Sequence, residues 1–264
     1  MSDAVAIPAL AELERIAGDA ARVGARQVRL GYGRALEVAR KSSPTDVVTQ
    51  TDLDAERLVA EFVLEATPAA GLLAEEGGGT APGSRLQWVV DPLDGTVNFL
   101  YGVPLFAVSI AAAVDGDVVA GAVIDVLRDE LFSAHLEGGA RCDGEPIATS
   151  HCERLAEALA VTGFSYQAAL RARQGDVFAR LLPLARDVRA FGSSALELCW
   201  VACGRVDGYF ERDIKIWDYS AGALIAAEAG AITELPCPEN EDLMIAAAPG
   251  IFEALRAAVE LSPS

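Results

Sequence analysis

Apolar residues recur at three- and four-residue intervals between Leu10 and Val23, and this spacing predicts an amphipathic helix that ends near Gly31. A second helical pattern begins near Asp52 and stops before Pro68. Short apolar runs follow, and their length predicts strands, with the hairpin signal Asp-Gly-Asp between the last two. These runs cover residues 72–73, 88–90, 106–114 and 118–126.

The pattern changes after about residue 150, where strand-like and helical segments alternate. Strands are expected at residues 159–161, 207–211 and 243–247, and helices at 168–184, 193–203, 219–229 and 251–261. The first part is typical of an α+β fold with an antiparallel sheet, and the second of an α/β fold. We therefore expect two halves, residues 1–150 and 151–264, joined without a flexible linker.

Composition and charge narrow the possible partners. The chain is 52% hydrophobic and 23% charged, which is typical of a globular protein. Its formal net charge of -18 disfavours nucleic acids and anionic membranes as partners. No apolar stretch reaches the roughly 18 residues of a membrane span, and the start lacks the regions of a signal peptide. With five scattered cysteines, we expect reduced thiols and a cytoplasmic protein.

The segment 88–99 carries the clearest candidate chemistry. We expect a buried strand to end at Asp91, and Asp94 follows three residues later, close enough to share a metal ion with it. The carbonyl of Leu93 lies between them, and such an all-oxygen set suits Mg²⁺. Gly95 allows the backbone to approach a ligand closely, and a short helix is expected to open there with its N–H groups facing a phosphate.

Asp, Pro and Gly are also common in turns, so this segment alone could be a plain turn. Two further acidic groups favour a cation site. Glu75 and Glu76 follow another strand, and Asp218 is expected as the N-cap of a helix. Each has an ordinary alternative, as an exposed turn or a helix cap. Three acidic groups at the ends of elements are more typical of one metal site.

These segments resemble the inositol monophosphatase family, one of the lithium-sensitive, magnesium-dependent sugar phosphatases, and in detail its actinobacterial type. Two specific signatures carry the resemblance, Trp-x-x-Asp-Pro-x-Asp-Gly-Thr-x-Asn-Phe from Trp88 and Trp-Asp-x-x-Ala-Gly from Trp217. It extends over almost the whole chain, with Ala74 as one departure where the family usually has glycine. The resemblance implies an α+β / α/β fold, a layered αβαβα sandwich of the inositol monophosphatase and fructose bisphosphatase type.

The resemblance also implies roles for individual residues. One group would supply oxygen ligands to Mg²⁺: Glu75, Asp91, the carbonyl of Leu93, Asp94 and Asp218. A second would orient or activate the attacking water: Asp52, Glu75 and Thr96. A third would bind the substrate: Lys41, Gly95, Thr96, Ser194 and Glu211.

The expected reaction is hydrolysis of inositol 1-phosphate, or a similar polyol phosphate, by metal-activated water without a covalent enzyme intermediate. One alternative is a related phosphatase that acts on histidinol phosphate, fructose bisphosphate or adenosine bisphosphate. Another is a non-catalytic regulatory or binding protein on the same fold, because a fold alone does not determine function. The family is usually dimeric, so we expect a homodimer, with the run 106–114 either at its interface or in the core.

Two further patterns have competing interpretations. The residues from Cys199 to Arg205 match Cys-x5-Arg, the loop of cysteine-based phosphatases, but their helical apolar spacing favours core packing. Glu211 could bind a substrate hydroxyl, or it could be a solvated glutamate or an ion-pair partner of Arg212 or Lys215 of a neighbouring subunit.

Overall fold

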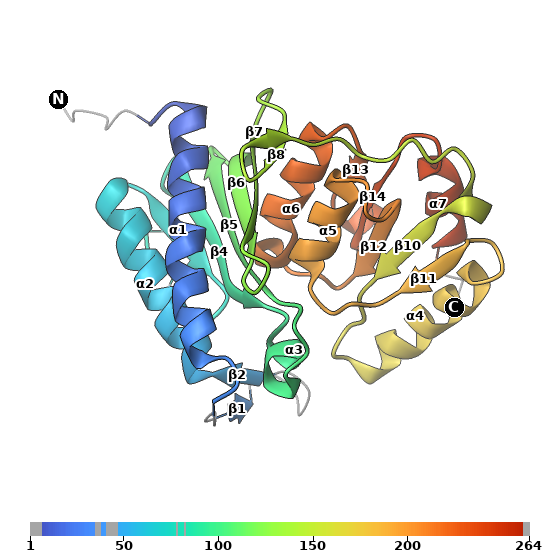
Figure 1. Cartoon of the computed structure of the whole chain (residues 1–264), viewed down its shortest axis with the longest axis horizontal. Coiled ribbons are helices and arrows are strands. Elements are labelled where there is room, and N and C mark those ends of the chain that lie inside the picture. Colours follow the sequence, from blue (N-terminus) through green and yellow to red (C-terminus); the bar gives the residue numbers. More distant parts are fainter. Residues whose placement is uncertain (1–6, 35–37, 41–46, 78, 82, 261–264) are drawn as a thin grey trace.

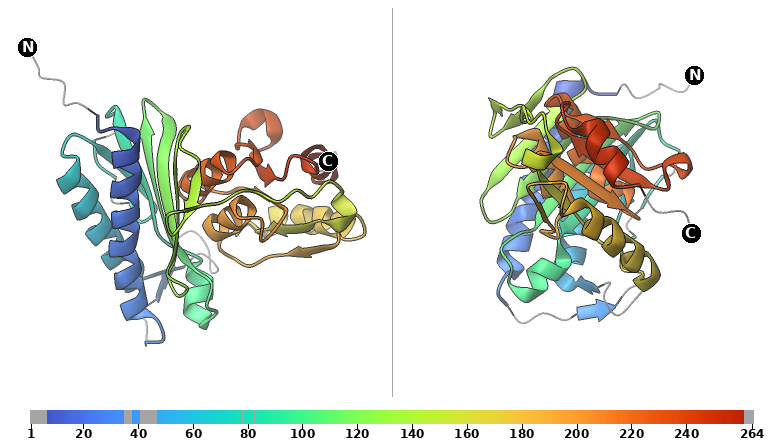
Figure 2. Two further views of the ribbon diagram at one scale, coloured as in Figure 1. Left: turned by 45° about the horizontal axis from the view of Figure 1, so that its top comes forward. Right: turned by 90° about the vertical axis from the view of Figure 1, so that its right-hand side faces the viewer.

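The computed structural model describes residues 7–34, 38–40, 47–77, 79–81 and 83–260. Within these ranges, the chain forms a larger and a smaller β-sheet, with helices outside each sheet and a helical layer between them (Figure 1). The order of layers is therefore α-β-α-β-α, and the expected layered sandwich is confirmed. The left view in Figure 2 shows the same separation of the sheets from another side.

The first outer layer consists of α1 (Leu10–Gly31) and α2 (Gln50–Ala66). Both pack an apolar stripe against the larger sheet, as the sequence periodicity predicts. Thr49 caps α2 and forms a capping box with Asp52, so this helix begins slightly before the expected start.

The larger sheet has seven strands in the described part of the chain, in the order β3-β4-β5-β6-β7-β8-β9. The β3–β4 pair is parallel, and the other neighbours are antiparallel. Its strands are β3 (Gly71–Ala74), β4 (Leu86–Asp94), β5 (Ala107–Val114), β6 (Asp117–Asp125), β7 (Glu130–His135), β8 (Ala140–Cys142) and β9 (Glu145–Pro146). The small ribbon of β1 (Val38–Arg40) and β2 (Val47–Thr49), and the helix α3 (Thr96–Tyr101), lie near one end of this sheet (Figure 1).

The smaller sheet has five described strands in the order β11-β10-β12-β14-β13. They are β10 (Leu159–Thr162), β11 (Asp187–Arg189), β12 (Gly208–Arg212), β13 (Ile232–Glu234) and β14 (Leu243–Ala247), with the 3₁₀ turns η1 (Leu155–Glu157) and η2 (Pro238–Asn240). Its outer face packs on α4 (Ala168–Leu181) and α7 (Phe252–Ala258). The chain passes from one sheet to the other between β9 and β10, and its division into residues 1–150 and 151–264 stays a prediction.

The middle layer consists of α5 (Ser194–Ala202) and α6 (Ile216–Glu228). Every residue of α5 after Ser194 is buried, because this helix has a sheet on either side. A helix that is apolar all round is stable only in such a position. This layer brings the N-termini of both helices to the C-terminal end of β4, where the acidic residues lie.

Several expected boundaries were wrong. α4 and α7 end about three residues early, and α6 begins about three residues before its expected start. Seven strands of the described residues were not anticipated: β1, β2, β7, β8, β9, β11 and β13. The run 106–114 proves to be core, because β5 lies between β4 and β6 and nearly all of it is buried.

Candidate active site

A β-bulge in β4 turns two aspartates to the same side of the larger sheet. Asp91 is opposite Ser109 of β5, and Asp94 is opposite Ala107, so three steps along β4 match two along β5. Residues three apart in a regular strand face opposite sides, and the extra residue of the bulge restores the same side. Both carboxylates therefore face α5 and α6, while the Leu93 side chain packs towards α1 and α2. The expectation that the strand ends at Asp91 was wrong, because β4 continues to Asp94.

Asp94 also connects the larger sheet to the middle layer. Its Oδ2 accepts hydrogen bonds from the Ser193 hydroxyl at 2.5 Å and from the Ala195 N–H at 2.8 Å. The side chain of the N-cap residue of α5, Ser193, does not cap the helix. Asp94 supplies the acceptor for the first turn of α5 in its place. Burial raises the pKa of Asp94 to about 7, against the opposing effect of these two hydrogen bonds.

Asp218 reaches the same place from α6. This helix begins at Ile216, so Asp218 lies in its first turn and the expectation of an N-cap was wrong. The Lys215 N–H donates to Oδ2 of Asp218 at 3.0 Å. Burial raises the pKa of Asp218 well above its usual range, and the charges of Asp94 and Glu75 raise it further.

Glu75 directly follows β3, which pairs with β4, so this neighbour brings it beside Asp91. Its N–H donates to the carbonyl of Val90 at 3.2 Å. Burial first, and then the charges of Glu75, Asp94 and Asp218, raise the pKa of Asp91. The four carboxylates therefore lie close enough to repel one another.

The donor set of this cluster fits a hard divalent cation. Carboxylates and the nearby carbonyl of Leu93 are all oxygen donors, and positive charge would relieve the repulsion that raises these pKa values. Within the described ranges, no three His, Cys, Asp or Glu side chains are arranged as they stand to hold one ion. One oxygen of Asp91, Asp94 and Asp218 is instead turned to the N–H of Leu93, Ala195 and Lys215, respectively.

The predicted pair Asp52 and Thr96 is in contact. The Thr96 hydroxyl lies 3.1 Å from Oδ1 of Asp52 and 3.0 Å from the Leu93 carbonyl oxygen. Oδ2 of Asp52 accepts from the N–H of Thr49 at 2.9 Å and from its hydroxyl at 2.5 Å. Burial raises the pKa of Asp52, and these hydrogen bonds oppose the shift. Sequence reasoning missed Thr49, although the capping-box spacing Thr-x-x-Asp was a signal for it.

Gly95 lies where α3 and the loop before α5 meet. It has φ of 92°, and a side chain there would bring Cβ to 3.0 Å from the Gly192 carbonyl oxygen. Asn98 of α3 fixes the same loop, because its Nδ2 donates to the carbonyls of Phe191 at 2.6 Å and Leu105 at 2.8 Å. The expected short helix after Gly95 is confirmed, and the loop that leads to Ser194 of α5 lies against its start.

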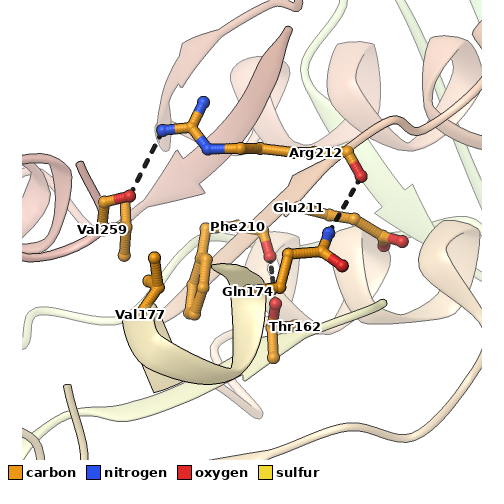
Figure 3. A pocket seen from close by; sticks show the side chains of 7 residues that line it. All are labelled: Thr162, Gln174, Val177, Phe210, Glu211, Arg212 and Val259. Carbon is orange, nitrogen blue, oxygen red and sulfur yellow. Dashed lines mark hydrogen bonds between the residues drawn. The ribbon is translucent and has the colours of Figure 1, made fainter. Parts of the chain in front are cut away.

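Glu211 has hydroxyl partners and no ion pair within the described part of the chain. Its Oε2 accepts from Ser194 at 2.9 Å and from Tyr209 at 2.6 Å. Lys215 pairs with Asp213 at 2.9 Å, and the Arg212 guanidinium turns away to backbone carbonyls, among them that of Val259 (Figure 3). The alternative ion pair of Glu211 with Arg212 or Lys215 of a neighbouring subunit stays a prediction.

The remaining candidate residues from the sequence lie away from the carboxylates or outside the described residues. Cys199 is fully buried inside α5, burial raises its pKa well above the usual range, and Arg205 pairs with Glu130 at 2.6 Å. The Cys-x5-Arg match is therefore not a phosphate-binding loop. The partly buried His135 of β7 contacts Glu14 of α1. Lys41 lies outside the described residues.

Comparison with known proteins agrees with this arrangement. The sequence matches the model of the inositol monophosphatase family over residues 9–260. The inositol-1-monophosphatase of Mycobacterium bovis is 44% identical over 265 residues, covering 94% of this chain and 91% of the relative. The Nus factor SuhB of Pasteurella multocida is 40% identical, covering 82% of each chain. The solved inositol monophosphatase of Anabaena sp. PCC 7120 has a TM-score of 0.85 at 33% identity, over 96% of this chain and 98% of that one.

Two sheets around a helical layer, with an acidic cluster at the junction, and the similarity to inositol-1-monophosphatases identify the chain as a phosphatase. More specifically, the chain belongs to the inositol monophosphatase family.

Proposed function

We propose that this phosphatase hydrolyses inositol 1-phosphate, or a similar polyol phosphate, and that Mg²⁺ is its metal. The observation that carries the proposal is the gathering of Asp91, Asp94 and Asp218 beside Glu75, where burial and the charges of neighbouring carboxylates raise the pKa values of the three aspartates. Such a cluster repels a phosphate dianion until cations neutralise it. The predicted ligands are Glu75, Asp91, the Leu93 carbonyl, Asp94 and Asp218.

The residues of this chain then have distinct tasks. When bound, the metal supplies positive charge to the phosphate and acidifies the attacking water. Thr96, held by Asp52, orients that water through its hydroxyl. The N–H groups of Gly95 and Thr96 bind phosphate oxygens, and Glu211 accepts a hydrogen bond from a hydroxyl of the alcohol.

A panel of phosphate monoesters tests this proposal. Inorganic phosphate release is measured for inositol 1-phosphate, histidinol phosphate, fructose 1,6-bisphosphate, adenosine 3′,5′-bisphosphate and an aryl phosphate, each with Mg²⁺ and with excess chelator. We expect the highest kcat/KM for inositol 1-phosphate and no turnover in chelator. A clear preference for one of the other esters would reassign the substrate. Inhibition by millimolar lithium is a family expectation that the same assay checks.

A second candidate function comes from relatives such as the Pasteurella protein, which is named a Nus factor. A regulatory role of this kind remains an alternative to catalysis. It predicts no phosphate release from any ester in the panel. Catalysis is favoured because the chain retains every acidic side chain that the family resemblance predicts as a ligand.

No helix in the described residues is long and apolar enough to cross a membrane. We propose a cytoplasmic homodimer, on the basis of the family resemblance and the scattered cysteines. Light scattering at micromolar concentration tests the dimer, and a mass equal to one chain would refute it.

A further inference from the structure

The strand β12 places Tyr209 beside Glu211. Residues two apart in a strand face the same side of the sheet, so both side chains turn towards α5. Phe210, between them, packs in the opposite core with α4 and α7. Tyr209 is completely buried, whereas Glu211 is partly exposed at the edge of the site. The phenol therefore approaches the carboxylate from the interior of the protein.

Both hydroxyl partners of Glu211 bind the same oxygen. Tyr209 donates to Oε2 at 2.6 Å and Ser194 donates to it at 2.9 Å. Within the described part of the chain, these are the hydrogen bonds that Glu211 accepts. An ionised carboxylate can accept at both oxygens, so Oε1 is left for a donor from a ligand.

Gly163 forms a wall on another side of the same carboxylate. It follows β10, whose Thr162 hydroxyl donates to the Phe210 carbonyl at 2.6 Å and so fixes the two strands together (Figure 3). A Cβ atom at position 163 would overlap the carboxylate of Glu211. The backbone at Gly163 is not in the left-handed region, so alanine would conflict with the Glu211 side chain and not with the chain conformation.

We propose that Tyr209 and Gly163 are positioning residues that hold Glu211 with Oε2 turned inwards and Oε1 towards the substrate. They thereby favour phosphate esters whose alcohol carries a further hydroxyl group. A free glutamate side chain loses considerable rotamer freedom when it binds a ligand, and a carboxylate already fixed at one oxygen avoids that loss. This inference rests on the proposed function, because it concerns the same substrate pocket.

Two substitutions test the positioning from different directions. Tyr209→Phe removes one hydroxyl and keeps the buried ring, and Gly163→Ala displaces the carboxylate. With Mg²⁺ present, we expect each to lower kcat/KM for inositol 1-phosphate about tenfold and that for p-nitrophenyl phosphate by less than about twofold. The matched controls are Tyr101→Phe, at a side chain that is 83% exposed, and Gly175→Ala, where a Cβ atom meets nothing within 4 Å. Neither control should change the ratio of the two kcat/KM values.

A double-mutant cycle separates positioning from a purely structural role. If Tyr209 acts through Glu211, Tyr209→Phe should cause little further loss of inositol 1-phosphate hydrolysis in a Glu211→Gln background. A full additional loss there, or an equal fall for both substrates, would overturn the inference. A wild-type protein without preference for inositol 1-phosphate overturns the proposed function and this inference together. A wild-type preference that neither substitution changes overturns this inference alone.

Discussion

The aspartates around the β4 bulge and Glu211 on β12 are acidic groups of one site, but their surroundings differ. Asp91, Asp94 and Asp218 face one another, their local donors are mainly backbone N–H groups, and burial first, then the charges of neighbouring carboxylates, raise their pKa values. Glu211 is paired with two neutral hydroxyls. In the proposed function, the first region takes its positive charge from bound Mg²⁺, whereas the second has hydroxyl partners among the described residues. We therefore propose that the first region performs the reaction and that the second selects the alcohol.

The largest effect on activity is expected from changes to the aspartate cluster of the first region. Asp94→Asn, or removal of metal by chelator, should lower kcat by about a thousandfold or more for every ester, because either change removes charge stabilisation from the phosphate. Steady-state phosphate release measures the loss. Asp115→Asn in the exposed β5–β6 turn makes the same chemical change away from the site and should leave kcat unaltered. Substantial turnover in excess chelator would contradict the metal mechanism.

The next largest effect is expected from a substitution of Glu211, which changes the second region alone. Glu211→Gln should weaken inositol 1-phosphate hydrolysis by about 1.5–3 kcal/mol, roughly ten- to a hundredfold in kcat/KM, and an aryl phosphate far less. Loss of an acceptor matters only for a substrate that donates to it. Glu253→Gln, on the exposed side of α7, is the matched control. An equal loss for both substrates would assign Glu211 to the metal site or the fold.

In the metal-free protein, the buried carboxylate of Asp94 should make the stability of the folded state depend on pH. The pKa of Asp94 is about 7 in the folded chain and near 3.8 when unperturbed, so the folded state binds a proton that the unfolded state releases. Stability from this group is present below pH 4 and is lost as the pH rises towards 7.

Thermal unfolding in chelator, compared with Asp94→Asn, isolates the contribution of Asp94. The melting temperature of the Asn variant should rise relative to that of the wild type between pH 4 and 7, by about 4 °C or more. Added Mg²⁺ should reduce this difference in melting temperature. A constant difference across this range would show that Asp94 is ionised throughout.

The smallest effect concerns a residue outside both regions. Cys199→Ser should leave kcat/KM within about twofold for folded protein, because the thiol is buried in α5. Its hydroxyl can bond within the helix, so a modest loss of stability is expected. Activity is normalised to the folded fraction by circular dichroism. A collapse of activity in fully folded protein would revive a thiol mechanism.

The layered fold and the acidic segments could be predicted from the sequence because they depend on local patterns. Helical periodicity located α1 and α2, and the signatures located Asp91, Asp94 and Asp218. The strand end was misjudged because Asp91 and Asp94 are three apart, and only pairing with β5 reveals the bulge that turns them to one side. Short strands such as β11 and β13 were missed because three residues give too little pattern.

Within the site, Tyr209 and Gly163 could not be identified from the sequence. The contact of Gly163 with Glu211 arises from the pairing of β10 with β12, which joins segments almost fifty residues apart. The contact of Tyr209, two residues before Glu211 on β12, depends on the burial of that side of the strand against α5. Thr49 was different, since its spacing from Asp52 is local and could have been read as a capping box. Long-range pairing, and not chemical identity, limited the sequence interpretation.

The hydrogen bonds from Ser193 and Ala195 to Asp94 have a consequence for how the chain folds. The first turn of α5 receives its acceptor from a strand about a hundred residues earlier, so that turn is complete only after the two sheets have come together. We therefore expect docking of the sheets and completion of the reactive centre to occur together. A nascent or partly unfolded chain would lack an assembled site, and recovery of catalysis during refolding should coincide with protection of the α5 amides from hydrogen exchange.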